Sequence, residues 1–447
     1  MEDGPQQPQL TPTRIDQLRD RFIHPKEWSR KRWLITGIVL VIVVGGSAFA
    51  LTRSSKAEED TVANKNCPTA TASGCGGTNK QAAQQVGFDP SRGACKGKGT
   101  VPLTTSPIAI AQIGVTEPLG QMIGGHVTPI DHGYIFGIDG HNAKPNQYPV
   151  LAPADGLIVE MTATHRTGFE EFTDHAITLS FTCNQFMHFL NMDSFDAAVL
   201  KQSGDVEPSK DWYGAIPVKA GQIIGYTGTH GIDIYSWNTA TKLTGFIKPD
   251  QYGKAEAWKV HTTDPYAYFT PSVKSQLMAK NPRTAAPRGG KIDYDIAGRL
   301  SGTWFKEGTG GYPSNVLPGE GINTWSGHLV FAPDAFDPTG LMISIGDWQG
   351  QALQFGVAGA QPDPTKVSVS SGMIKYELRK YNWLTASGSN WDNISYQGPV
   401  TFNPNGAVQG VLLVQMTDDG HLKVEQFPSK TASQVSDFTT QAALYER

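Results

Sequence analysis

Short apolar runs separated by turn-forming residues fill the sequence from about residue 107 onward, and this pattern restricts the fold more than any other feature. Runs this short have the length of β-strands rather than of typical helices. The 49 glycines and 29 prolines of the chain supply the turns between them. Only residues 193–201 indicate a short helix, so we predict an all-β fold. The candidate strands of its first half are 108–113, 133–138, 148–151, 157–161, 176–181, 186–190, 222–226 and 231–235.

A second β unit is predicted to follow a linker at residues 283–297, which are rich in Pro, Gly and charged residues. Residues 298–447 then form a C-terminal β-sandwich or barrel. The aromatic residues of this half suit a core and turn corners, and a carbohydrate-binding platform is the alternative use for them. The candidate strands are 299–305, 326–331, 340–346, 354–357, 367–369, 373–378, 410–416 and 422–427.

The second unit opens with residues 298–305, which read GRLSGTWF. This segment faintly resembles the first strand of lipocalin-like barrels. From the residues alone, Trp304 is interpreted as an anchor at the base of a β-sandwich or barrel.

An uncharged apolar run at residues 33–51 precedes both β units. As a helix it would span about 28 Å, close to the hydrocarbon thickness of a bilayer. Lys26 and the RKR sequence at 30–32 lie on its N-terminal side, which predicts a cytoplasmic N-terminus. The alternative is a cleaved signal peptide with a small-x-small cleavage site at 48–50. The predicted order is a cytoplasmic tail at 1–32, a transmembrane helix at 33–51 and an extracytoplasmic stalk at 52–104, with the bulk of the chain outside a single-pass cell membrane anchor.

All four cysteines, Cys67, Cys75, Cys95 and Cys183, follow the apolar run. An even number in an extracytoplasmic region predicts two disulfides, for which three connectivities exist. Zinc binding by these thiols is the alternative, but no Cys-x-x-Cys spacing supports it. The net charge of −4 and the absence of basic clusters argue against nucleic acid as a partner.

Histidines and carboxylates gather between residues 124 and 165. This stretch contains His126, His132, His141 and His165 beside Asp131 and Asp139. Imidazole and carboxylate are common zinc ligands, so the stretch is a candidate metal site. The same residues could equally serve as polar groups that fix an irregular loop.

Two segments carry a family resemblance. Residues 150–158 read VLAPADGLI, and residues 218–228 read VKAGQIIGYTG. They resemble the V-x-A-P-x-x-G-x-V and V-x-x-G-Q-x-I-G-x-x-G hairpins of the lysostaphin-like (M23, LytM-type) peptidase family. The resemblance covers about residues 107–275, and we predict one β domain of this type at residues 105–282. It implies an antiparallel β-sheet groove that holds one zinc and cleaves the peptide cross-bridges of peptidoglycan.

The site residues of that family carry over only in part. His188, within FMHFL at 186–190, matches the assisting histidine of the Y-x-H-L strand. Asp131 stands at the ligand histidine of H-x-x-x-D, and Ile135 stands at its ligand aspartate. Asp233 and Tyr235 occupy the two positions of the H-x-H strand. The usual ligand set is therefore missing.

A rearranged site is the remaining route to metal chemistry. We predict His126, Asp131 and His132 as candidate metal ligands, and His188 and Asp233 as candidate catalytic residues. His230 lies close enough in sequence to Asp233 to join the same groove.

Two functions compete on this basis. The first is a membrane-anchored extracytoplasmic protein with a catalytically degenerate domain that binds or regulates cell-wall or envelope components, without an assigned cofactor. The second is an active zinc-dependent endopeptidase that cleaves peptidoglycan cross-bridges with a rearranged ligand set. A purely structural surface protein is a third, weaker interpretation.

Overall fold

The computed structural model describes residues 94–166, 172–208, 210–252, 256–312 and 325–447. The predicted cytoplasmic tail, the transmembrane run, most of the stalk, Cys67 and Cys75 lie outside these residues. Within the part of the chain that is described, no helix has both the length and the apolar character needed to cross a membrane. The described residues belong to one compact unit.

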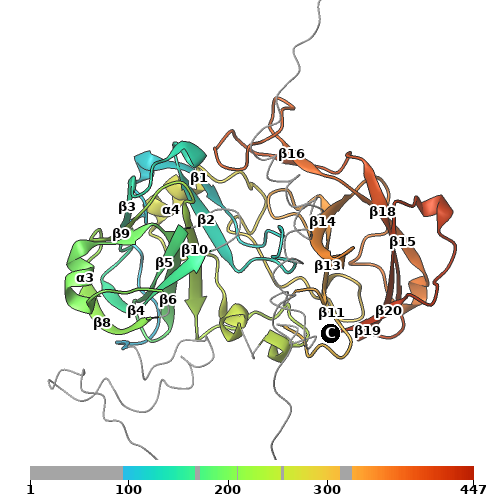
Figure 1. The fold of residues 1–447 in the computed structure, drawn as a ribbon, viewed down its shortest axis with the longest axis horizontal. Helices are drawn as coiled ribbons and strands as arrows, with labels where there is room; N and C mark the ends of the chain where they lie inside the picture. Colours follow the sequence, from blue (N-terminus) through green and yellow to red (C-terminus); the bar gives the residue numbers. More distant parts are fainter. Residues whose placement is uncertain (1–93, 167–171, 209, 253–255, 313–324) are drawn as a thin grey trace, which may run out of the picture. The chain divides into compact units, whose positions relative to one another are not determined.

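An all-β fold was predicted, and the described residues are mostly β with two short helices; the first half contains two antiparallel sheets (Figure 1). One sheet has seven strands in the order β1-β2-β10-β6-β5-β4-β8, and the other has three in the order β3-β9-β7. The strands of the larger sheet are β1 (Ile113–Glu117), β2 (His132–Gly137), β10 (Ile232–Asn238), β6 (Gln185–Met192), β5 (Phe172–Ser180), β4 (Gly156–Arg166) and β8 (Trp212–Val218). Those of the smaller sheet are β3 (Tyr148–Leu151), β9 (Ile223–Thr227) and β7 (Ser194–Phe195).

The two motif segments pair with each other rather than folding back as separate hairpins. β3 pairs with β9, while β4 pairs with β8, so each motif contributes one strand to each sheet. The backbone of Ala152 joins the two corners, because it donates to the carbonyl of Gln222 and accepts from the amide of Gly221. Chain segments about 70 residues apart thereby form one structural element.

The main core of this half is made by the inward-facing residues of both sheets. Val150 of β3, Ile224 of β9, Ile158 of β4 and Ile234 of β10 are all fully buried in it. Because side chains alternate along a strand, the neighbours of the core residues on β2, β10 and β6 point to the opposite face of the large sheet. That opposite face carries the histidines and acids of interest.

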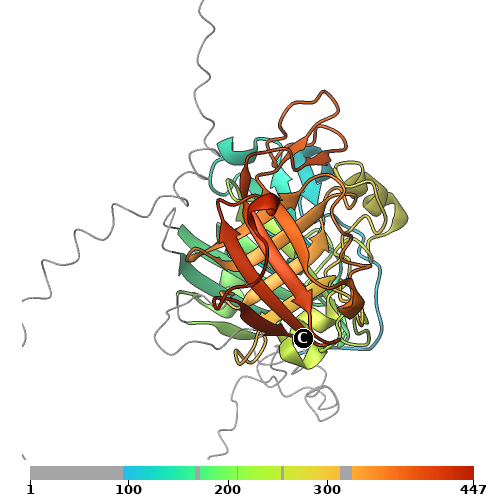
Figure 2. The same ribbon diagram turned by 90° about the vertical axis from the view of Figure 1, so that its right-hand side faces the viewer.

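The second half is a closed eight-stranded barrel, which decides between the predicted sandwich and barrel (Figure 2). Every neighbouring pair of strands is antiparallel, and β20 pairs back onto β11 to close the barrel. Trp304 is fully buried in the barrel core. The strands are β11 (Gly302–Lys306), β12 (His328–Pro333), β13 (Leu341–Trp348), β14 (Gln351–Val357), β15 (Ile374–Arg379), β18 (Val408–Met416), β19 (His421–Pro428) and β20 (Ala443–Glu446), with a separate two-stranded sheet of β16 (Asn382–Leu384) and β17 (Thr401–Asn403).

Helices are few among the described residues. The predicted helix at 193–201 is present as the shorter α3 (Ala197–Ser203), which begins after Asp196 because that side chain accepts from the Ala198 amide. A second helix, α4 (Pro271–Met278), was not predicted. Single 3-10 turns occupy Ile110–Gln112, Gly140–Asn142, Pro249–Tyr252, Ala257–His261, Val369–Ser371 and Ala432–Gln434.

Two predicted strands are wrong. Residues 108–113 are mostly a 3-10 turn, and the strand begins only at Ile113. Residues 367–369 form no strand, because the amide of Val367 donates to the carbonyl of Asp363 and closes a local turn. Apolar side chains in both segments are buried without belonging to a strand.

Of the two predicted disulfides, the described residues contain Cys95–Cys183, which joins positions 88 residues apart, while Cys67 and Cys75 lie outside the described part. The segment around Cys95 is also held by backbone contacts, since Cys183 donates its amide to the carbonyl of Gly97. The side chain of Gln185 accepts from the amide of Val101 and donates to its carbonyl. Residues 94–101, within the predicted stalk, therefore dock against the turn between β5 and β6.

Candidate functional site

Three neighbouring strands bring the predicted site residues onto one face of the large sheet. Tyr235 on β10 lies opposite His132 on β2 and opposite His188 on β6. The ring centroids of His132 and Tyr235 are 4.2 Å apart, and those of His188 and Tyr235 are 5.3 Å apart. The Tyr235 ring therefore separates the two histidines.

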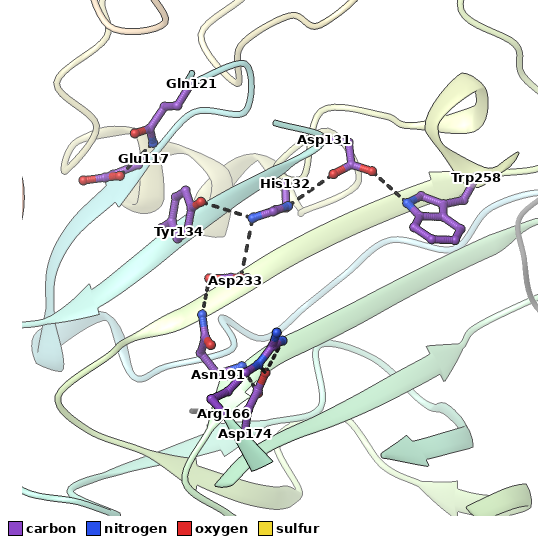
Figure 3. Close-up of polar contacts among 10 residues, drawn as sticks. All are labelled: Glu117, Gln121, Asp131, His132, Tyr134, Arg166, Asp174, Asn191, Asp233 and Trp258. Atoms are coloured by element: carbon purple, nitrogen blue, oxygen red, sulfur yellow. Dashed lines mark hydrogen bonds and ion pairs between the residues drawn. The ribbon is translucent and has the colours of Figure 1, made fainter. Parts of the chain in front are cut away.

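His132 is buried and has partners at both ring nitrogens (Figure 3). Its Nδ1 lies 3.2 Å from Asp131 Oδ1. Its Nε2 lies 3.1 Å from the Tyr134 hydroxyl and 3.5 Å from Asp233 Oδ2. Since a carboxylate only accepts, Nδ1 carries the proton in its contact with Asp131. The imidazole is thus a bridge between two buried acids.

The second oxygen of Asp131 is also engaged, because Trp258 Nε1 donates to Oδ2 across 2.7 Å. Burial alone would raise the pKa of Asp131, but Lys259, His132 and Trp258 outweigh it and hold that pKa well below its usual range. Burial likewise opposes the charge on Lys259, yet the attraction of Asp131 and Glu256 leaves the Lys259 pKa above its ordinary value. Asp131 is accordingly a charged, hydrogen-bonded carboxylate.

Asp233 connects the same network to β5. Burial raises the pKa of Asp233 above its ordinary value, although His132 and a hydrogen bond from Asn191 oppose that rise. Asn191 Nδ2 donates to Asp233 Oδ1 across 2.8 Å, and the Asn191 amide donates to Asp174 Oδ1 across 2.8 Å. Arg166 holds the other oxygen of Asp174 through Nε at 3.0 Å and Nη2 at 2.7 Å. The result is a continuous chain of polar contacts from β2 to β4, drawn in Figure 3.

His188 belongs to a separate contact on the same face. Thr178 Oγ1 donates to Glu160 Oε2 across 2.6 Å and lies 2.9 Å from His188 Nδ1. Because a hydroxyl has one proton, Nδ1 is the donor to Thr178, and the lone pair of this imidazole is on Nε2. Burial lowers the pKa of His188 to about 4, so the ring is neutral near pH 7. It stacks on Trp237 with centroids 5.8 Å apart, and Trp237 Nε1 is buried without a hydrogen-bond partner among the described residues.

Glu117 on β1 is a further buried acid beside the network. Burial raises its pKa to about 8, although a hydrogen bond from Gln121 partly opposes that shift. The Gln121 amide donates to Oε2 across 2.8 Å, whereas Oε1 has no partner in the described part of the chain. Glu117 is therefore mostly protonated near neutral pH.

The donor set does not fit a zinc site of the kind that the resemblance implies. Both ring nitrogens of His132 and both carboxylate oxygens of Asp131 already contact other protein groups. Ile135 is fully buried in the apolar core. His126 has an exposed side chain whose ring centroid is 6.0 Å from that of His132. His230 instead stacks on Phe172 at 4.3 Å. Within the described ranges, no group of three or more His, Cys, Asp or Glu side chains is arranged to hold a metal ion.

Several residues of the network were not identified from the sequence. Tyr134 could have been found, because it lies two residues after His132 on β2 and therefore points to the same face of the sheet. Trp258 and Glu117 reach the site from positions that no local spacing connects to the histidines, and Asn191, three residues after His188, meets Asp233 through the pairing of β6 with β10. Only the tertiary pairing brings them together.

Comparison with known proteins adds no relative. Neither the protein-family models, the curated proteins nor the solved structures contain a match to this chain.

Proposed function

We propose that this chain is a membrane-anchored extracytoplasmic protein whose first β half is a non-catalytic, lysostaphin-like module that binds cell-wall or envelope components. The observation that carries the proposal is the state of the ligand positions. Asp131 is held by His132 and Trp258, while Ile135 and Tyr235 stand where two further ligands belong. A polar face whose side chains are held by contacts with one another suits ligand recognition better than metal-dependent peptide hydrolysis.

The pairing of the two motif segments supports the lysostaphin-like assignment. Each motif gives one strand to the large sheet and one to the small sheet, through β4–β8 and β3–β9. The two motifs are separate segments in the sequence. Because they pair with each other, we infer that they form one structural unit.

The disulfide supports the extracytoplasmic location. Disulfides persist in oxidising compartments and are rare in the cytosol. Cys95–Cys183 lies on the C-terminal side of the apolar run at 33–51, on the side that the positive-inside rule places outside the cell.

The test is retention of the purified full chain, in detergent, on isolated peptidoglycan at moderate salt. The wild type is expected to sediment with the wall material. His188→Ala is expected to reduce retention, since His188 is part of the half-buried aromatic face. His421→Ala, at an exposed histidine of the barrel, is the matched control and is expected to bind like the wild type. A wild type that stays in the supernatant would count against the proposal.

The competing zinc peptidase is tested on the same material. It predicts about one zinc per chain by elemental analysis, and release of soluble peptides from the wall. A chelator, His126→Ala and His188→Ala should each abolish that release. Chelator-sensitive release with stoichiometric zinc would overturn the non-catalytic proposal.

A further inference from the structure

A cavity of about 590 Å³ lies at one end of the barrel, and none of its lining residues belongs to the sheet face described above. It is found where β11 and β13 begin and where β12 and β14 end. Its walls come from the connection between β12 and β13, from the segment after β14, and from β17. The barrel interior behind it is filled by apolar side chains such as Phe331 and Ile343. The cavity is therefore a site at the barrel rim rather than an opening into the barrel.

The lining combines flat apolar surfaces with hydrogen-bonding groups. Neither Lys, Arg nor His is among the described residues that form it. The apolar part consists of Phe331, Leu341, Val357, Phe402 and four prolines at 333, 338, 364 and 404. The polar part includes Asp337, Thr339, Gln361, Asp363, Thr365 and Thr401.

The aromatic wall of the cavity is fixed in place by glycines beneath it. A Cβ at Gly340 would lie 2.3 Å from the Phe402 ring, and one at Gly356 would lie 3.1 Å from the tip of that ring. Only glycine therefore lets the ring approach β13 and β14 this closely. The Phe402 amide also donates to Asp337 Oδ2 across 3.0 Å, which holds β17 against the connection between β12 and β13.

Asp363 is the acceptor best placed for a ligand. Its Oδ1 accepts from the amide and the hydroxyl of Thr365, at 2.9 Å and 2.8 Å. Its Oδ2 lies 3.9 Å from Lys366 Nζ, beyond hydrogen-bond distance, and both side chains are largely exposed. The loop itself is tied to the barrel, because the amide of Ser301 donates to the carbonyl of Pro364. One oxygen thus orients the carboxylate, while the other faces the exposed Lys366 ammonium and has no hydrogen bond in the described part of the chain.

We propose that this rim cavity binds a neutral saccharide of one or two rings. The aromatic and proline surfaces match the apolar faces of a sugar ring, while the carboxylates and the Gln361 amide accept from its hydroxyls. The lack of a cationic side chain in the lining disfavours phosphorylated or carboxylated ligands. The volume falls within the range of about 300–1,000 Å³ that is typical of small-ligand sites. No residue of the sheet face lines this site, and the proposal does not depend on the proposed wall-binding function.

The experiment is a calorimetric titration of the full chain in lipid nanodiscs, which avoids sugar-based detergents. The probes are cellobiose and N,N′-diacetylchitobiose, with glucose 6-phosphate and putrescine as anionic and cationic comparisons. Saturable binding of at least one neutral disaccharide is expected, with a dissociation constant on the order of 1 mM. Weaker or absent binding is expected for glucose 6-phosphate.

Two variants locate the binding. Asp363→Asn keeps an acceptor for Thr365 but removes the charge, and it is expected to weaken saccharide binding about tenfold. Thr401→Trp places a large side chain in the cavity at an exposed position and is expected to abolish binding. Asp347→Asn, at an exposed aspartate that accepts from the Gly350 amide, and Thr417→Trp are the matched controls outside the cavity.

Unfolding midpoints equal to that of the wild type establish that the variants are folded. Should Thr401→Trp fail to fold, the conservative Asp363→Asn still decides the question. The proposal is overturned if neither disaccharide binds, or if both cavity variants bind as tightly as their controls. It is also overturned if putrescine alone binds and Asp363→Asn removes that binding, because the cavity is then a site for cations.

Discussion

The indole nitrogen of Trp258 donates to the carboxylate of Asp131 across 2.7 Å, joining two residues 127 positions apart in the chain. Trp258 belongs to the 3-10 turn Ala257–His261, whereas Asp131 immediately precedes β2. The contact occupies the carboxylate oxygen that His132 leaves available. It keeps a buried charge satisfied without a metal ion.

Trp258→Phe is predicted to destabilise the fold by about 1–3 kcal/mol, because a buried carboxylate loses one of its donors. Urea unfolding of the purified chain gives the change in free energy. Trp237→Phe is the matched control, since the Trp237 indole nitrogen has no partner among the described residues. Equal losses in the two variants would mean that ring packing, and not the hydrogen bond, determines the effect.

Glu117→Gln is predicted to stabilise the protein relative to wild type as the pH rises from about 5 to 8. The folded-state pKa of about 8 lies above the ordinary value of 4.5. The folded protein therefore holds a proton that the unfolded chain has lost, and the free energy of unfolding falls across this window as pH rises. The Gln side chain removes that titration while still accepting from Gln121.

Unfolding curves at several pH values check the Glu117 prediction. Glu207→Gln, at an exposed glutamate, serves as the control and should follow the wild type at every pH. The raised pKa would be contradicted if the free energies of unfolding of Glu117→Gln and of the wild type differed by the same amount at every pH from 5 to 8.

Breaking Cys95–Cys183 is predicted to cost about 4 kcal/mol, because the bond closes a long loop in the unfolded chain. The separation is 88 residues. A double Cys95→Ser, Cys183→Ser variant and the wild type can be compared by thermal unfolding, with and without reductant. The double variant Cys67→Ser, Cys75→Ser keeps the Cys95–Cys183 pair and should remain sensitive to reductant. Loss of that sensitivity would show that Cys95–Cys183 is not the stabilising bond.

Arg447→Lys is predicted to destabilise the barrel by about 2 kcal/mol, despite keeping the charge. The guanidinium carbon of Arg447 lies 4.0 Å from the centre of the Trp304 ring. Its nitrogens also donate to the carbonyls of Ser301, Ile296 and Arg299, and one ammonium cannot reproduce that planar arrangement.

Arg379→Lys provides the comparison for Arg447, since Arg379 is partly exposed and pairs with Glu377. Its substitution should change the free energy of unfolding by less than about 1 kcal/mol. Similar losses for both arginines, in denaturant unfolding, would contradict the special role of the Trp304 contact.

The sequence predicted strands well where burial alternates along a regular segment. Most of the candidate strands were found, because their apolar residues face a core on one side or both. It failed at residues 108–113 and 367–369, where apolar side chains are buried by turns rather than by strands. The helix α4 was missed because its sequence, PSVKSQLM, has only three large apolar side chains, at Val273, Leu277 and Met278.

The candidate site shows the same limit of sequence reasoning. His132, Asp233 and His188 could be placed together because strands β2, β10 and β6 were recognisable and their side chains alternate. Asn191 lies on β6 as well, but its contact with Asp233 depends on the register of pairing between β6 and β10, and Trp258 comes from a turn that returns to the sheet. Local patterns contain no information on either. Whether the face binds a wall component stays a prediction until it is measured.

The position of Cys95–Cys183 also has a mechanical consequence. Tension applied to the chain ahead of Cys95 is shared between the backbone that leads to the edge strand β1 and the sulfur–sulfur bond to the turn between β5 and β6, inside the seven-stranded sheet. Part of the load therefore reaches strands that are paired on both sides, instead of falling on β1 alone. Reducing this one covalent bond would return the whole load to the backbone path through β1.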